Sequence, residues 1–195
     1  LTMTNTIVDL LYKNNHINKD EIEAYKFCID IIIEYITFIM ISLILGSLFS
    51  LLIPVALFML VFLLLHSYGG EVHARTHIRC TIYSYLLIIL FIVICLFLLP
   101  KWNNIYNYCI ISLYILSFFT YVLFTPVIPC NKQITSEEHT VFRFMCIITD
   151  IIICVVFTIC MLSGSHRLCT AICFGSSLAS FSLIAAKRKE SGHES

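Results

Sequence analysis

The fold of this chain is decided by a polar stretch between two apolar runs, His66-Ser67-Tyr68-Gly69-Gly70-Glu71-Val72-His73-Ala74-Arg75-Thr76-His77-Ile78-Arg79-Cys80. The stretch holds two of the chain's six glycines and three of its seven histidines. The runs on either side are apolar enough to lie in a bilayer, where residues of this polar kind are costly. We therefore expect the stretch to connect membrane spans rather than to cross the membrane itself.

Composition places the chain among integral membrane proteins. Of its 195 residues, 59% are hydrophobic and only 12% are charged. Soluble domains have about 45–50% apolar and about 25% charged residues, so the deficit of charge decides the class. The formal net charge of +0 argues against a nucleic-acid partner. Residues 3–18 mix polar and apolar side chains and do not show the pattern of a signal peptide.

The apolar runs predict an all-α, polytopic membrane fold forming one domain over residues 1–195. About 20 residues cross the hydrocarbon core, so the apolar run 28–65 is too long for one span. Gly46-Ser47 is its natural break. The six predicted spans cover about residues 28–47, 49–66, 81–100, 105–125, 141–162 and 168–186.

The N-terminal segment, residues 4–27, alternates apolar and polar positions. We expect a pair of short amphipathic helices on the membrane surface, interrupted at Asn14-Asn15 and starting again at Asn18. Such a segment suits an interfacial anchor, and a docking site for a partner helix is the alternative.

The basic residues predict the orientation of the chain. With both termini in the cytoplasm, only Lys101 and Arg167 of the twelve lysines and arginines fall outside, which leaves ten inside. This is a strong positive-inside bias, and it places the 66–80 stretch on the cytoplasmic side of the cell membrane.

Most of the ten cysteines are predicted to act as small hydrophobic side chains. Only Cys80 and Cys130 lie in clearly polar segments, and neither has the spacing of a zinc module. The other eight lie within or beside apolar runs: Cys28, Cys95, Cys109, Cys146, Cys154, Cys160, Cys169 and Cys173. A reduced, cytosol-facing location therefore fits the chain best.

Acidic residues within the predicted spans need a compensating environment. Glu34 and Asp150 lie where an unpaired carboxylate is costly, and Asp30 shares a helix face with Glu34. We expect them to line the interior near the cytoplasmic mouth, where Arg or His can pair with them. A pore or proton path is the alternative interpretation.

The polar stretch contains the elements of a reactive thiol. A neighbouring imidazolium or guanidinium stabilises a thiolate and lowers the pKa of a free cysteine from about 8.5. In a regular helix His77 would lie one turn from Cys80, whereas His73 would lie ~10 Å away along the axis. Helix geometry thus favours His77, and His73 could pair with Cys80 only if the segment bends. From these residues alone, either histidine is a candidate general base.

Gly69-Gly70, His73-Ala74 and Cys80 together resemble the motif of the accessory gene regulator B (AgrB) proteins, in which the cysteine follows the histidine by seven residues. These are membrane cysteine endopeptidases of Gram-positive quorum sensing. A second loop resembles the family in its Pro-Val, Asn-Lys and Glu-Glu pairs at Pro126-Val127, Asn131-Lys132 and Glu137-Glu138. The chain departs from the family at His66, where an Arg is frequent, and at Glu71, where a Gly is usual.

The resemblance implies a nucleophile, Cys80, and a general base, His73, with His77 kept as the alternative. It implies cleavage of a precursor peptide of the AgrD type at its acidic C-terminal tail. A thioester on Cys80 would then be resolved by ring closure to a thiolactone or lactone autoinducing peptide. No metal or cofactor is implied, and the expected partners are the precursor, membrane lipid and a second copy of the chain.

The resemblance also assigns supporting roles within the two loops. The acidic tail of the precursor would meet a positive field, and amides of the glycine pair would stabilise the oxyanion. The residues in these two roles are Arg75, Arg79 and Lys132 for the tail, and Gly69 and Gly70 for the oxyanion.

Two other classes of protein are compatible with parts of the sequence. A membrane metal-binding protein could use His66, His73, His77 and Cys80, since imidazoles and a thiolate suit first-row metals. It lacks the HExxH arrangement, because Ala74 stands where the glutamate would be. A small transporter could instead use Glu34 and Asp150.

The predicted orientation gives a direct test on Cys80. A membrane-impermeant thiol reagent should leave Cys80 unmodified in intact cells and should label it in inverted membrane vesicles, because the basic residues place it inside. Mass spectrometry of the Cys80 peptide provides the measurement. Labelling of Cys80 from outside intact cells would overturn the orientation.

Overall fold

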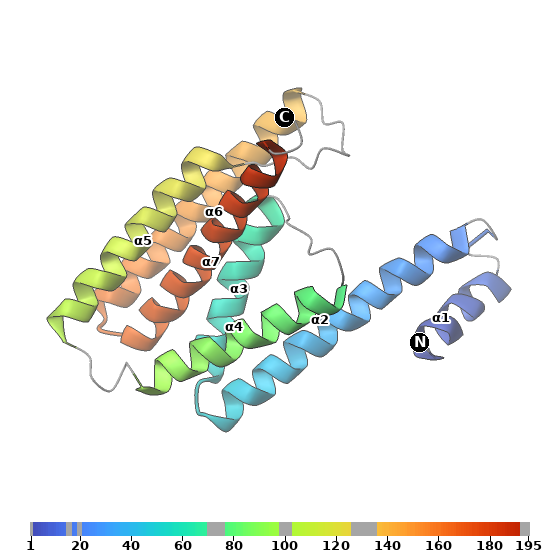
Figure 1. The fold of residues 1–195 in the computed structure, drawn as a ribbon, viewed down its shortest axis with the longest axis horizontal. Helices are drawn as coiled ribbons and strands as arrows, with labels where there is room; N and C mark the ends of the chain where they lie inside the picture. The colour runs from blue at the N-terminus through green and yellow to red at the C-terminus, as the bar shows by residue number, and fades with distance from the viewer. Residues whose placement is uncertain are drawn as a thin grey trace. The chain divides into compact units, whose positions relative to one another are not determined.

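The computed structural model describes residues 2–14, 17–18, 21–69, 77–97, 103–125 and 136–191, and these form helices and turns without a strand. The all-α fold predicted from the sequence is therefore confirmed for this part of the chain. Figure 1 shows the order of the helices, which are α1 Thr2–Lys13, α2 Ile22–Leu48, α3 Leu52–Gly69, α4 His77–Phe97, α5 Asn104–Phe124, α6 Ser136–Leu162 and α7 His166–Ser191.

Four of the helices are long and apolar enough to cross a membrane: Ile22–Leu48, Asn104–Phe124, Glu138–Leu162 and His166–Lys187. These correspond to four of the six predicted spans. The other two predicted spans appear among the described residues as shorter apolar segments, Leu52–His66 and Ser84–Phe97. The chain is thus a multi-pass membrane protein, and the total of six spans stays a prediction.

Residues 1–44 form a compact unit of their own. In it, the Thr4 hydroxyl of α1 donates a hydrogen bond to the Asp30 carboxylate of α2. The Glu21 carboxylate accepts from the backbone N–H of Asn18 at 2.9 Å, as in a capping box, and so marks the predicted helix start. The helix then runs without a break from Ile22 to Leu48. The structure differs here from the expected second surface helix, because residues 22–27 continue into the span.

Residues 45–195 form the second unit, and two of its turns are set by Schellman motifs. After α2, the Leu51 N–H donates to the Gly46 carbonyl at 2.7 Å, with Ser50 at a φ of 55°. After α6, the Ser165 N–H donates to the Cys160 carbonyl at 3.0 Å, with Gly164 at a φ of 68°. Both turns lie where the sequence predicted a break. Glycine adopts the left-handed conformation of the second turn without strain.

Helix α7 is the centre of this second unit. It contacts α3, α4, α5 and α6, and 56% of its membrane-spanning window is buried, compared with 17% for α5. A Cβ atom at Gly175 would lie 3.0 Å from the Phe58 carbonyl oxygen of α3. The missing side chain at Gly175 therefore lets the two helix backbones approach closely.

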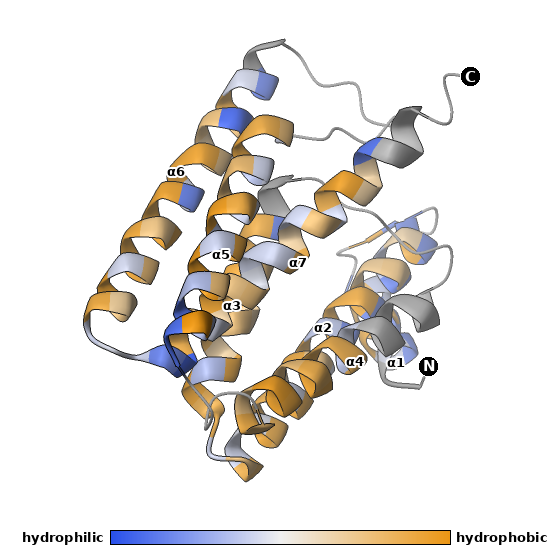
Figure 2. Cartoon of the chain, turned by 60° about the vertical axis from the view of Figure 1, so that its left-hand side comes forward, coloured by the Kyte–Doolittle hydropathy of each residue, from blue (hydrophilic) through white to orange (hydrophobic). Residues whose placement is uncertain are grey.

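Hydroxyl groups join α7 to α5. Ser117 and Ser177 share a hydrogen bond between their hydroxyls at 2.9 Å, and the Ser180 hydroxyl donates to the Ser117 carbonyl at 2.9 Å. Within hydrocarbon such bonds between helices supply attraction that apolar contact with lipid cannot. The outward faces of these helices are largely hydrophobic, as expected for surfaces that meet lipid (Figure 2).

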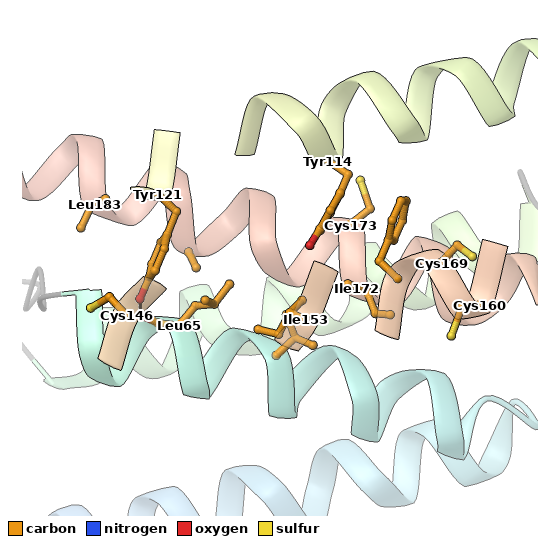
Figure 3. Close-up of a cluster of buried hydrophobic side chains, with 13 residues drawn as sticks. Leu65, Tyr114, Tyr121, Cys146, Ile153, Cys160, Cys169, Ile172, Cys173 and Leu183 are labelled. Atoms are coloured by element: carbon orange, nitrogen blue, oxygen red, sulfur yellow. Dashed lines mark hydrogen bonds between the residues drawn. The ribbon is translucent and has the colours of Figure 1, made fainter. Parts of the chain in front are cut away.

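The core of the second unit is built from aromatic rings, aliphatic side chains and thiols (Figure 3). Tyr114 of α5 stacks on Phe157 of α6, with ring centroids 4.0 Å apart. The rings of Phe58 of α3, Phe91 of α4 and Phe174 of α7 all pack against one another, with centroids 4.9 to 5.7 Å apart. None of the eight cysteines predicted to act as small hydrophobes forms a disulfide among the described residues, and five of them are buried.

The second unit also buries a carboxylic acid, Asp150. Its side chain in the middle of α6 is only 1% exposed, and neither carboxylate oxygen has a hydrogen-bond partner among the described residues. The prediction that Arg or His would pair with it is not met in this part of the chain. An unsatisfied polar group inside the bundle costs stability, so Asp150 should weaken the fold rather than support it.

We expect Asp150→Leu to stabilise the protein by about 1–3 kcal/mol, because it removes two unsatisfied oxygens and keeps the number and branching of the side-chain heavy atoms. Thermal unfolding of the detergent-solubilised protein provides the measurement. Asp150→Asn is the matched control and should give no such gain, since its amide leaves polar atoms unpartnered. A lower unfolding temperature for Asp150→Leu would show that the carboxyl group is stabilised in the native state.

Candidate functional site

Four of the sequence-predicted site residues lie at the end of α3 and the start of α4. Gly69 is the last residue of α3, and His77, Arg79 and Cys80 fall within the first turn of α4. The remaining members of the predicted site lie outside the described residues, and these are Gly70, His73, Arg75 and Lys132.

The start of α4 bears on the choice between the two histidines. Of the two, only His77 shares a described helix with Cys80. Residues 73–76 lie outside the described residues, so the helix argument against His73 is not tested. Both histidines therefore remain candidates for the general base.

The first turn of a helix favours a thiolate at Cys80. The four N-terminal amides of a helix have no partner within it, and the helix dipole places partial positive charge there. Both effects stabilise an anion, and cysteines at helix N-termini are often more acidic than free cysteine.

The end of α3 is held by a buried hydrogen bond from α5. The Tyr121 hydroxyl donates to the Leu65 carbonyl at 2.7 Å, and each of these two residues is 1% exposed. Figure 3 shows Tyr121 reaching across to Leu65, with Cys146 of α6 beside it. Leu65 lies in the last turn but one of α3, directly before the polar stretch that carries the predicted site.

A second contact to the end of α3 comes from α7. The Ser182 hydroxyl lies 3.4 Å from Nδ1 of His66, and the His66 ring stacks on Phe62 with centroids 5.2 Å apart. His66 is the position where the AgrB motif often has an arginine. The histidine is therefore packed against the bundle and linked to α7.

The two polar loops leave the second unit at the same end. At this end, the Lys187 ammonium of α7 lies 4.6 Å from the centre of the Phe124 ring, the last residue of α5. The Thr125 N–H caps α5 by donating to the Tyr121 carbonyl at 3.0 Å. We call this the loop end of the bundle, defined by Leu65, His66, Tyr121, Phe124, Thr125, Ser182 and Lys187.

The alternative functions find limited support in the described residues. Asp30 accepts a hydrogen bond from the Thr4 hydroxyl, and it is exposed within its own unit. No group of three His, Cys, Asp or Glu side chains that could hold a metal occurs in the described part. The proposed metal set is not tested by this finding, because among its side chains only that of His66 is described.

Tyr121 and Ser182 were not selected by the sequence analysis. Both lie within apolar spans and match no motif. The available signal was weak: a tyrosine hydroxyl buried in a span must find a partner, but the sequence does not say which. Only the packed helices identify that partner as the end of α3.

Comparison with known proteins supplies the family. No curated protein and no solved structure matches the chain. The model of one family, Accessory gene regulator B, matches residues 4–183. This match covers all of the spans and both loops in nearly their full length. The chain therefore belongs to the AgrB family, and this membership implies a membrane peptidase that processes the precursor of an autoinducing peptide.

Proposed function

We propose that this chain is a membrane cysteine endopeptidase that removes the C-terminal tail of an AgrD-type precursor and closes the remaining peptide into a thiolactone or lactone ring. The observation that carries the proposal is the Gly-Gly, His73 and Cys80 motif inside a family match over residues 4–183. The location of Cys80 in the first turn of α4 supports its role as the nucleophile.

In the first step the Cys80 thiolate attacks the carbonyl carbon of the peptide bond before the tail. His73 takes the thiol proton as general base and then gives it to the nitrogen of the leaving tail. The C–N bond breaks, the tail departs as an amine, and the peptide remains on Cys80 as a thioester. No oxidant, metal or cofactor is needed for this exchange.

In the second step a thiol or hydroxyl of the precursor attacks the thioester. The new C–S or C–O bond closes the ring and the C–S bond to Cys80 breaks, while His73 takes the proton of the attacking group and returns it to the Cys80 sulfur. Water would hydrolyse the thioester instead, so a site at the membrane boundary favours cyclisation by limiting access of water.

The supporting roles fall to residues in the two loops. Arg75, Arg79 and Lys132 provide positive charge for the acidic tail. Of the glycine pair, Gly70 is the better candidate for the oxyanion, since Gly69 lies within α3 and its N–H serves the helix. The loops and both termini face the cytoplasm, and a homodimer is the proposed assembly.

The nucleophile is tested by substitution. Cys80→Ala should abolish cleavage of the precursor while leaving the protein inserted, because its thiol is the attacking group. Cys130→Ala is the matched control, since Cys130 is the other cysteine in a polar loop, and it should remain active. Cleavage is followed by mass spectrometry of the released tail.

The same experiment can trap the intermediate. A precursor whose central cysteine or serine is replaced by alanine has no internal acceptor, so a hydroxylamine-sensitive adduct on Cys80 should accumulate. If Cys80→Ala still cleaves the precursor, the cysteine mechanism is wrong, and a metal mechanism through His66, His73 and His77 should be tested with chelators.

The general base is tested by comparing the two histidines. We expect His73→Ala to lose about 10²–10⁴-fold in cleavage rate, the usual contribution of a general acid–base group, and His77→Ala to retain most activity. Single-turnover cleavage at saturating precursor provides the rates. An inactive His77→Ala beside an active His73→Ala would move the role of base to His77.

A further inference from the structure

The last turns of α3 connect the packed bundle to the proposed catalytic segment. Helix α3 ends at Gly69, and the polar stretch with His73 and Cys80 follows. The last carbonyls of a helix lack partners within it, so helix ends fray unless other groups hold them. Any loosening of this end would change the point from which the chain enters the catalytic segment.

Two side chains from other helices hold this end. Tyr121 of α5, 56 residues away in sequence, donates its hydroxyl hydrogen to the Leu65 carbonyl at 2.7 Å. A carbonyl oxygen can accept two hydrogen bonds, so this bond adds to the helical one. The Ser182 hydroxyl of α7 lies 3.4 Å from His66 Nδ1, on the next residue along α3.

We propose that Tyr121, supported by Ser182, is a positioning residue for catalysis: by fixing the end of α3 it fixes the start of the catalytic segment relative to Cys80. Tyr121 acts through the Leu65 carbonyl and touches no reacting atom. The inference rests on the proposed function, since it assigns to Tyr121 a part in the reaction of Cys80.

Tyr114 provides a matched control on the same helix. It lies two turns before Tyr121, is 3% exposed, and stacks on Phe157. Its hydroxyl has no hydrogen-bond partner among the described residues. Replacement of either tyrosine by phenylalanine removes one buried oxygen, but only Tyr121→Phe releases the end of α3.

The test uses the full-length protein in detergent or membranes. We expect Tyr121→Phe to lower kcat for precursor cleavage about tenfold with KM nearly unchanged, because misplacement of catalytic groups by a fraction of an ångström has effects of this order. The iodoacetamide reactivity of Cys80, followed by mass spectrometry across a pH series, should shift toward that of an unassisted thiol. Tyr114→Phe should retain the wild-type kcat and the wild-type pH profile.

Ser182→Ala releases the same helix end from α7, and it should lower kcat in the same direction with KM unchanged. If Tyr121→Phe fails to insert into the membrane, the kcat of Ser182→Ala tests whether the contacts at the end of α3 position the catalytic groups. A wild-type kcat and pH profile in Tyr121→Phe would overturn the inference, as would equal losses in Tyr121→Phe and Tyr114→Phe.

Cys80→Ala, measured in parallel, separates this inference from the proposed function. If Cys80→Ala loses cleavage while Tyr121→Phe keeps the wild-type kcat and pH profile, only the positioning role of Tyr121 is overturned. Cleavage by Cys80→Ala overturns the cysteine mechanism and, with it, the role assigned to Tyr121.

Discussion

The close approach of α7 to α3 at Gly175 is the contact on which the arrangement of the second unit depends. In a bilayer the lipid tails are as apolar as the helix surfaces, so burial of hydrophobic side chains gives little reason for helices to associate. Association must come from tight packing and from hydrogen bonds between helices. The α7 backbone supplies both, through Gly175 against Phe58 and through serine hydroxyls against α5.

Polar groups inside the bundle are used in two different ways. Ser117, Ser177 and Ser180 satisfy one another or a backbone carbonyl, and so they join helices. Asp150 is buried among the same helices without a partner in the described residues. A carboxyl group in that position opposes folding, which makes its presence the least expected feature of the core.

The proposed chemistry is located at the edge of this bundle rather than within it. Loops carry catalytic groups well when a rigid scaffold fixes their ends. Here the scaffold is the loop end, where Tyr121 and Ser182 hold α3 and where α5 also stops.

The sequence by itself determined the class of fold, the breaks between helices and the identity of the motif. These properties are local. The apolar runs require helices in lipid, and Gly164 is a residue type that ends helices. The first turn follows α2 at residues 49–51, just after the predicted break at Gly46-Ser47. The Gly-Gly, His73 and Cys80 spacing is likewise a property of one short stretch, and it resembles the motif of the family whose model matches residues 4–183. The separate surface helix expected near Asn18 failed for a local reason too, because nothing after Glu21 interrupts α2.

Only the tertiary structure decided which faces of the apolar helices meet. Helices that are hydrophobic on all sides carry no stripe that points to a partner, so the central role of α7 could not be read from their pattern. The bond from Tyr121 to Leu65 joins residues 56 positions apart, and neither belongs to a motif. The isolation of Asp150 likewise depends on every neighbour that packing brings to it. Such pairings arise from three-dimensional packing, where a single glycine can determine how closely two helices approach.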